Sequence, residues 1–250
     1  MWLILAWPCR ASAEVPDLNG IWQAMNSAHW NVEAHAAHAA PLTQSGALGA
    51  APAGLGVVNS SVIPYLPWAL EQRRLNFQHR VELDPVVKCY MPGVPRATYL
   101  PFPFQIVQTP DYILFAYEFA GASRTVNMDR PDLEAPAESW MGHSRGHFEG
   151  ETLVVEVTDQ VAGTWFDRAG NFHSDALRVV ERYTPIGPSH LMYEATIEDP
   201  KVFARPWKLS MPLYRRMETD AQLLEFKCIE FVEELMYRHL QRDLEPKRQP

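Results

Sequence analysis

The chain has 250 residues, of which 47% are hydrophobic and 21% charged, and its formal net charge is -8. This is the composition of a globular protein with enough apolar side chains to bury a core. An acidic chain without a run of lysine and arginine repels a phosphate backbone, so no nucleic-acid partner is expected.

The first residues favour an export signal. A short apolar run is followed by Ala11-Ser12-Ala13, the small-residue pattern of a signal-peptide cleavage site. We therefore expect residues 1–13 to be a signal peptide and the mature protein to be periplasmic or secreted. The run is shorter than the roughly 20 apolar residues of a membrane-spanning helix. No later stretch qualifies either, so no transmembrane segment is expected.

The cysteines fit an oxidising compartment. Of the three, Cys9 would leave with the signal peptide, and Cys89 and Cys228 would remain as a pair. An even number of cysteines in an exported protein favours a disulfide between them. The alternative is two separate buried thiols, each packing as a small apolar side chain.

Two regions are expected after the signal peptide. Residues 14–66 are rich in alanine, glycine and proline and are interpreted as an extended arm that begins with a strand at Gly20-Ile21-Trp22. Residues 67–250 are expected to form a single β-rich domain. Its first element is a predicted helix over 67–81, because proline suits a first helical turn and apolar residues follow at helical spacing.

Strand patterns dominate the rest of the chain. Residues 84–104 contain five prolines and are expected to form an ordered loop or edge segment. Short strands separated by turns favour an antiparallel barrel or sandwich over an alternation of strands and helices. Strands are predicted at 111–119, 124–128, 152–158, 176–184, 190–198, 207–215 and 222–231, and a second peripheral helix at 232–242.

Two polar loops are candidates for a site. One carries Trp140 and His143, and the other, within 159–175, carries Trp165, Asp167 and His173. Loops hold functional groups more often than strands do, and each loop combines a tryptophan with a histidine that titrates near neutral pH. These five residues are expected to converge on one pocket mouth. With a single strand, 151–158, between them, the loops would leave opposite ends of a barrel, so one must fold back along its wall.

Glu181 is the candidate for acid–base chemistry, because strand alternation places it on an apolar face, where burial raises the pKa of a carboxyl group. The alternatives are a surface pair with Arg178 or Arg182 and a buried pair with Arg205.

Several other chemistries are not supported. His143 and His147 have the spacing of a helical metal pair, but Ser-Arg-Gly lies between them instead of a sequence that holds a helix and a glutamate base. Ser144 and Ser174 lack the G-x-S-x-G context of a nucleophile elbow. There is no glycine-rich phosphate loop and no C-x-x-C pair. No metal and no cofactor are therefore expected.

Two resemblances extend this interpretation. Asn19-Gly20-Ile21-Trp22 resembles the Gly-x-Trp entry of lipocalin-like barrels, which implies a lipocalin- or calycin-like barrel with Trp22 plugging one end. From Pro16 to about His239 the chain also resembles a family of exported bacterial proteins of unknown function. That family's phrases appear here at 16–22, 88–96, 139–144 and 172–177. The resemblance implies export and no particular activity.

Three functions remain open. The first is an exported binding protein for a small apolar or aromatic molecule, contacted by Trp22, Trp140, Trp165 and Trp207. The second is a cofactor-independent isomerase, lyase or hydrolase that uses His143, Asp167, His173 and Glu181. The third is a structural component of the cell envelope. A pocket with converging polar groups favours the enzyme, an apolar pocket favours the binding protein, and the lack of a pocket favours the structural component.

Overall fold

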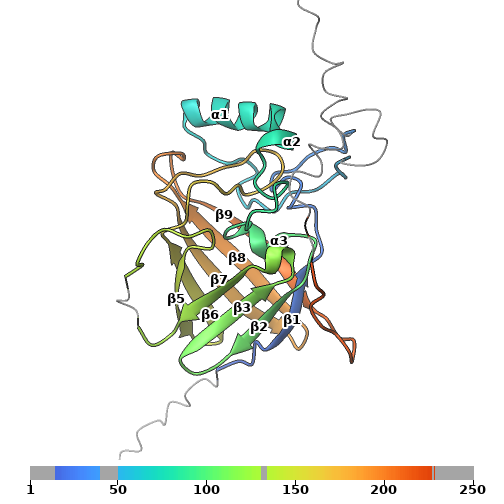
Figure 1. Ribbon diagram of the computed structural model, residues 1–250, viewed down its shortest axis with the longest axis vertical. Helices are drawn as coiled ribbons and strands as arrows, with labels where there is room; N and C mark the ends of the chain where they lie inside the picture. Colours follow the sequence, from blue (N-terminus) through green and yellow to red (C-terminus); the bar gives the residue numbers. More distant parts are fainter. Residues whose placement is uncertain (1–14, 40–49, 131–133, 227, 229–250) are drawn as a thin grey trace, which may run out of the picture.

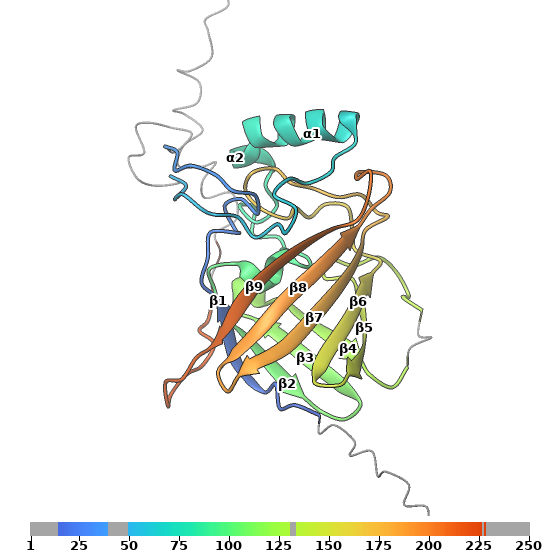
Figure 2. The same ribbon diagram turned by 180° about the vertical axis from the view of Figure 1, so that it is seen from behind.

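A computed structural model describes residues 15–39, 50–130, 134–226 and 228. Nine strands form a closed barrel in chain order, and β1 pairs with β9 to complete the wall. Every neighbouring pair is antiparallel except β4 and β5, which are parallel (Figures 1 and 2). The prediction of a mainly β, lipocalin-like barrel is confirmed, and the first of its two predicted peripheral helices lies outside the wall.

The helices lie outside the wall, at one end of the barrel. The helices are α1 (Pro67–Gln78), α2 (Arg80–Leu83), α3 (Arg96–Tyr99) and the short 3-10 helix η2 (Phe119–Gly121). The strands are β1 (Gly20–Ala24), β2 (Phe104–Gln108), β3 (Tyr112–Tyr117), β4 (Ser123–Asn127), β5 (His143–Glu149), β6 (Thr152–Thr158), β7 (Arg178–Gly187), β8 (His190–Glu198) and β9 (Trp207–Arg215).

Most predicted elements are confirmed. The bounds of β6, β8 and β9 are those predicted, and the predicted helix over 67–81 corresponds to α1 and α2. The strand predicted at 222–231 is wrong where it is described, since residues 222–226 and 228 form no strand. The helix predicted at 232–242 and the predicted signal peptide at 1–13 lie outside the described residues. Two strands, β2 and β5, were not predicted.

Side chains fill the interior of the barrel. Strands β7 and β8 alternate buried and partly exposed residues, as a barrel wall requires. Inward-facing aromatic side chains such as Phe104, Phe115 and Tyr193 have no accessible surface. A side chain lining a water-sized hole would keep some accessible surface, so the space around these rings is packed and not a ligand cavity.

Trp22 closes the end of the barrel at which β1 begins and β9 ends. It is 1% exposed, and its indole N–H donates to the carbonyl oxygen of Leu18 at 2.9 Å. The guanidinium of Arg215 lies 4.8 Å above the ring and donates to the carbonyl oxygens of Asp17 and Asn19. This stack fixes the segment before β1 across the end of the barrel.

The other end of the barrel is covered by the arm, by α1 to α3 and by the loop after β6 (Figures 1 and 2). Apart from β1, the described part of the arm contains no helix or long strand. It is held by isolated bridges, including Val58 with Leu209 and Tyr65 with Phe203. Val32 and Ile63 of the arm belong to the same apolar core as the barrel. The arm is therefore a packed cover over this end.

Cys89 and Cys228 form a disulfide, with their Cα atoms 5.7 Å apart. The bridge fastens the chain after β9 to the proline-rich segment before α3. Phe226 packs there between Phe102 and Phe119, with ring centroids 4.9 and 4.8 Å away. A disulfide of this kind is typical of proteins that fold in an oxidising compartment. Within the described residues, no helix is long and apolar enough to cross a membrane.

Candidate ligand-binding site

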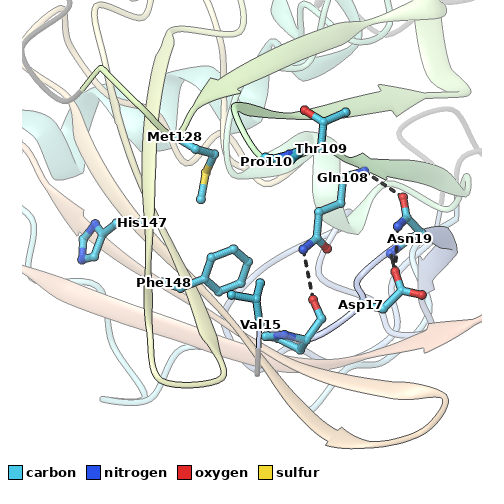
Figure 3. Close-up of a pocket in the computed structure, with 10 residues that line it drawn as sticks. Val15, Asp17, Asn19, Gln108, Thr109, Pro110, Met128, His147 and Phe148 are labelled. Carbon is cyan, nitrogen blue, oxygen red and sulfur yellow. Dashed lines mark hydrogen bonds between the residues drawn. The ribbon is translucent and has the colours of Figure 1, made fainter. Parts of the chain in front are cut away.

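A pocket of about 710 Å³ lies at the end of the barrel that Trp22 closes. Its volume is in the range of sites for small molecules. Four chain segments meet around it: the residues before β1, the end of β2 with the β2–β3 turn, the residue after β4, and two residues of β5 (Figure 3). The lining consists of Val15, Pro16, Asp17, Asn19, Gln108, Thr109, Pro110, Met128, His147 and Phe148.

The pocket exists because the wall is incomplete beside β5. The parallel ladder between β4 and β5 has only two residue pairs, Val126 with Ser144 and Asn127 with Arg145. After Asn127 the chain turns toward β3, where the N–H of Met128 donates to the carbonyl oxygen of Asp111 at 3.0 Å. Strand β5 continues to Glu149 without β4 beside it, which leaves a gap between β5 and the β2–β3 turn.

One wall of the pocket is apolar. In Figure 3, Phe148, Met128 and Val15 point toward the same space, whereas His147 lies on the other face of β5. Strand alternation explains this, because successive side chains point to opposite faces. His147 is within 3.3 Å of the carboxylate of Glu149. The apolar wall provides contact area for a ligand.

The opposite wall is polar and held in place by hydrogen bonds. The Gln108 side chain donates to the carbonyl oxygen of Pro16 at 3.1 Å and accepts from the N–H of Leu18 at 2.9 Å. The N–H of Gln108 donates to the side-chain oxygen of Asn19 at 2.8 Å. Asn19 in turn donates to Asp17 from its backbone and its side chain, and these bonds lower the pKa of the Asp17 carboxyl. The pocket therefore holds a fixed carboxylate beside an apolar wall.

None of the residues predicted from the sequence lines this pocket. Glu181 lies inside the barrel, with the apolar side chains of its strand face, and its side chain is fully buried. Its partner is Arg124 of β4 at 2.6 Å, and not Arg178, Arg182 or Arg205. Arg178 and Arg182 point outward. Arg178 pairs with Glu156 of β6 and Glu198 of β8, and Arg182 pairs with Glu149 of β5.

Tyrosine hydroxyls complete the Arg124–Glu181 cluster. Tyr183 and Tyr193 donate to the Glu181 carboxylate at 3.0 and 2.7 Å, and Arg124 donates to Tyr117 and Tyr183 at 3.0 Å each. Burial alone would lower the pKa of Arg124, but the Glu181 charge, the nearby Tyr117 and Tyr183 and the hydrogen bond to Glu181 together outweigh burial, and the pKa lies well above its usual value. The cluster is buried, since none of its members is more than 5% exposed, and its polar groups bond to one another.

His173 acts as part of a clamp within the loop after β6. Its Nδ1 is 2.8 Å from the carbonyl oxygen of Ser174, which places the ring proton there. Its Nε2 then accepts from the hydroxyl of Thr164 at 2.6 Å. Gln160 lies beside both and bonds the backbone of Val94 through its amide nitrogen and oxygen. The histidine thereby helps to connect the loop after β6 to the segment before α3.

Asp167 connects the same loop to the arm. It accepts hydrogen bonds from the N–H of Val32 at 2.8 Å, from the N–H of Ala169 at 2.9 Å and from the side chain of Asn171 at 2.6 Å. Burial raises the pKa of Asp167 to about 6, although the bonds from Asn171 and Val32 oppose the shift. Asp167 thus holds the arm over the barrel end.

The two predicted loops leave the same end of the barrel, so the expected fold-back is not needed. Strand β5 was not predicted, and with β5 and β6 forming a hairpin, the chain before β5 lies beside the chain after β6. Ser139 forms a bridge with Gln160, and Gly163 lies against the Trp140 ring. These contacts bring the two loops together, and convergence of all five residues on one pocket mouth stays a prediction.

The four tryptophans have different environments. Trp22 and Trp207 are 1% and 2% exposed and belong to the core, where Trp207 packs edge-on against Phe166 and Phe203. Trp165 is buried in the loop after β6 and bridges Phe172. Trp140 is partly exposed, and its ring centroid lies 5.1 Å from that of Tyr90. Of the four, Trp140 has the most surface to offer a ligand.

Buried histidines give stability a predicted dependence on pH. Burial lowers the pKa of both His29 and His173, so the folded protein keeps them neutral when the unfolded chain becomes protonated. Stability should therefore fall as the pH decreases below about 6.5, by at most about 1.4 kcal/mol per pH unit for each proton.

Urea unfolding of wild type and His173→Gln at pH 7 and pH 5 tests this expectation. The variant should lose less stability than the wild type between the two values. Equal losses would show that His173 is protonated in the folded protein. His190→Gln, in an exposed strand end, is the control that should leave the difference unchanged.

Three comparisons complete the description of the site. Scans against family models, curated proteins and solved structures returned no match. Within the described residues, no group of three or more histidine, cysteine, aspartate or glutamate side chains is arranged to hold a metal ion. The function is therefore argued from the geometry of the pocket.

Proposed function

We propose that this protein is an exported binding protein that holds a small, mainly apolar molecule in the pocket between β5 and the β2–β3 turn. The observation that carries the proposal is the pocket of about 710 Å³, in which an apolar wall faces a hydrogen-bonded polar wall. This combination provides contact area together with a few groups that orient a ligand. A lipocalin-like carrier would be expected to hold its ligand in the interior of the barrel. The site proposed here lies instead at the end of the barrel, outside that interior.

The acid–base alternative has less support. Glu181 and Asp167 have no accessible surface, and His173 is 3% exposed. Each of the three is engaged by hydrogen bonds within the fold. A general acid or base must come within hydrogen-bond reach of a substrate, which these environments do not favour.

Binding can be measured with the fluorescent dye N-phenyl-1-naphthylamine, whose emission rises in an apolar site. Phe148→Ala removes the ring that forms the apolar wall, and we expect it to weaken dye binding about tenfold or more. Tyr112→Ala is the matched control, since Tyr112 is an exposed aromatic residue of β3 that does not line the pocket. Equal loss in both variants, or no loss in Phe148→Ala, would contradict the proposed site.

Export is the second part of the proposal. The Ala11-Ser12-Ala13 pattern, the Cys89–Cys228 disulfide and the resemblance to exported bacterial proteins support it. Expression in a bacterial host with a periplasm should yield processed protein outside the cytoplasm. Intact-mass measurement should give a chain beginning at Glu14. Recovery of the full-length chain from the cytoplasm alone would contradict export.

A further inference from the structure

Strand β5 has a backbone edge that no strand covers. Its ladder with β4 ends at the pair of Asn127 with Arg145, and β5 continues to Glu149. In the part of the chain that the structure describes, no strand pairs with β5 on this side beyond that point. An uncovered edge offers peptide N–H and C=O groups to another extended chain.

The register shows which groups face the gap. A two-residue turn joins β5 to β6, so the pair that closes it, Glu149 with Thr152, is a hydrogen-bonded pair. Backbone groups alternate along a strand, and those of Phe148 and Gly146 therefore face away from β6. The parallel ladder with Asn127 uses the N–H of Gly146. The C=O of Gly146 and both backbone groups of Phe148 are left facing the gap.

The pocket lies directly beside these groups. Phe148 contributes to its apolar wall, and Asp17 stands on the opposite wall (Figure 3). Asp17 is the single acidic side chain among the ten lining residues, and its carboxylate is held by Asn19. A ligand that fits both walls combines an apolar group with a positive charge, and the chain's net charge of -8 favours its approach.

We propose that the ligand of this pocket is an extended, amide-bearing chain, such as a short peptide, that pairs with the free edge of β5. One apolar side chain would lie against Phe148, and a positively charged group would lie near Asp17. Main-chain hydrogen bonds then give affinity, and the pocket selects the side chain, as in other cases of strand addition. The inference rests on the proposed function and specifies the chemical class of its ligand.

The test uses the mature protein and the tetrapeptide amide Val-Leu-Val-Leu-NH₂, which has a free amino terminus. Its affinity is measured by isothermal titration calorimetry and compared with that of the same peptide methylated on its backbone nitrogens. Methylation removes the donors and keeps the side chains and the charge. We expect it to weaken binding by about tenfold or more, since the donors that would bond to the free carbonyl oxygens of β5 are lost.

Two further arms test the charge and separate the proposals. Asp17→Asn should weaken binding of the free-amine peptide and leave its N-acetylated form unchanged. Dye binding without peptide binding, or equal affinity for the methylated peptide, would overturn the peptide class and leave the pocket intact as a binding site. Failure of both dye and peptide to bind would overturn the proposed function as well.

Discussion

Replacing Glu181 with leucine is expected to lower the free energy of unfolding by about 3–5 kcal/mol. The change leaves the Arg124 guanidinium, whose side chain is 1% exposed, inside the barrel without a counter-charge. It also removes the acceptor of the Tyr183 and Tyr193 hydroxyls, which no water can replace in a packed interior. Guanidinium chloride unfolding followed by tryptophan fluorescence measures the loss.

A double variant separates the ion pair from the rest of the core. Arg124→Met combined with Glu181→Leu removes both charges and keeps comparable apolar volume. Such replacements of a buried pair are often close to neutral, so the double variant should be much more stable than Glu181→Leu alone. A Glu181→Leu loss below about 1 kcal/mol, or a double variant no more stable than the single one, would contradict the assigned energetics.

The alternation of side chains predicted most of the barrel wall. Strands β8 and β9 alternate buried and more exposed residues, and β6 carries Leu153, Val155 and Val157 on one face, although Thr152 and Val154 are buried too. The bounds of all three strands followed from these sequence patterns. Strand β5 lacks such a pattern, because its inward positions are Ser144, Gly146 and Phe148. Strand β2 follows Pro101 and Pro103, which suggested a loop. A strand that has small side chains on its inner face, or prolines just before its start, shows little alternation of apolar and polar residues and is therefore hard to predict from the sequence.

The partner of Glu181 illustrates a second limit. Alternation correctly placed Glu181 on the inner face, but Arg124 lies 57 residues earlier in the chain, and the sequence does not show that the two strands face each other across the barrel. Arg178 and Arg182, the arginines nearest to Glu181 in sequence, are on the outer face, because successive side chains of a strand point to opposite faces. Register across a barrel depends on every connection between the strands, which the local pattern does not contain.

The pocket was not predicted because its lining comes from four separate segments. Its rim includes Asp17 and Asn19, which entered the sequence analysis only through the two resemblances, and Thr109 and Pro110, which form the β2–β3 turn. Tryptophan and histidine drew attention to other loops, yet Trp22 and Trp207 are core residues here. The gap itself arises from the short parallel pairing of β4 with β5, a feature of topology. The only sign of the pocket in the sequence was that the segment before β1 and the β2–β3 turn would lie side by side at one end of an antiparallel barrel.

Loss of the Cys89–Cys228 disulfide is expected to lower the free energy of unfolding by about 2–5 kcal/mol. The two cysteines are 139 residues apart, so the bridge closes a loop that contains eight of the nine strands. A link over so long a segment restricts the unfolded chain strongly. The Cys89→Ser/Cys228→Ser variant, compared with wild type in denaturant without reductant, measures this contribution.

The disulfide also holds the segment around Phe226 against the barrel. This local effect has to be distinguished from the restriction of the unfolded chain. Phe226→Ala keeps the disulfide and removes the ring that packs between Phe102 and Phe119. If the bridge stabilises the barrel by restricting the unfolded chain, the double serine variant should unfold at clearly lower denaturant than Phe226→Ala. If it only holds the segment after β9 in place, the serine variant should unfold at the same denaturant concentration as wild type, because the barrel wall would form equally well without it. We expect the first outcome, since the loop that the bridge closes contains most of the barrel wall.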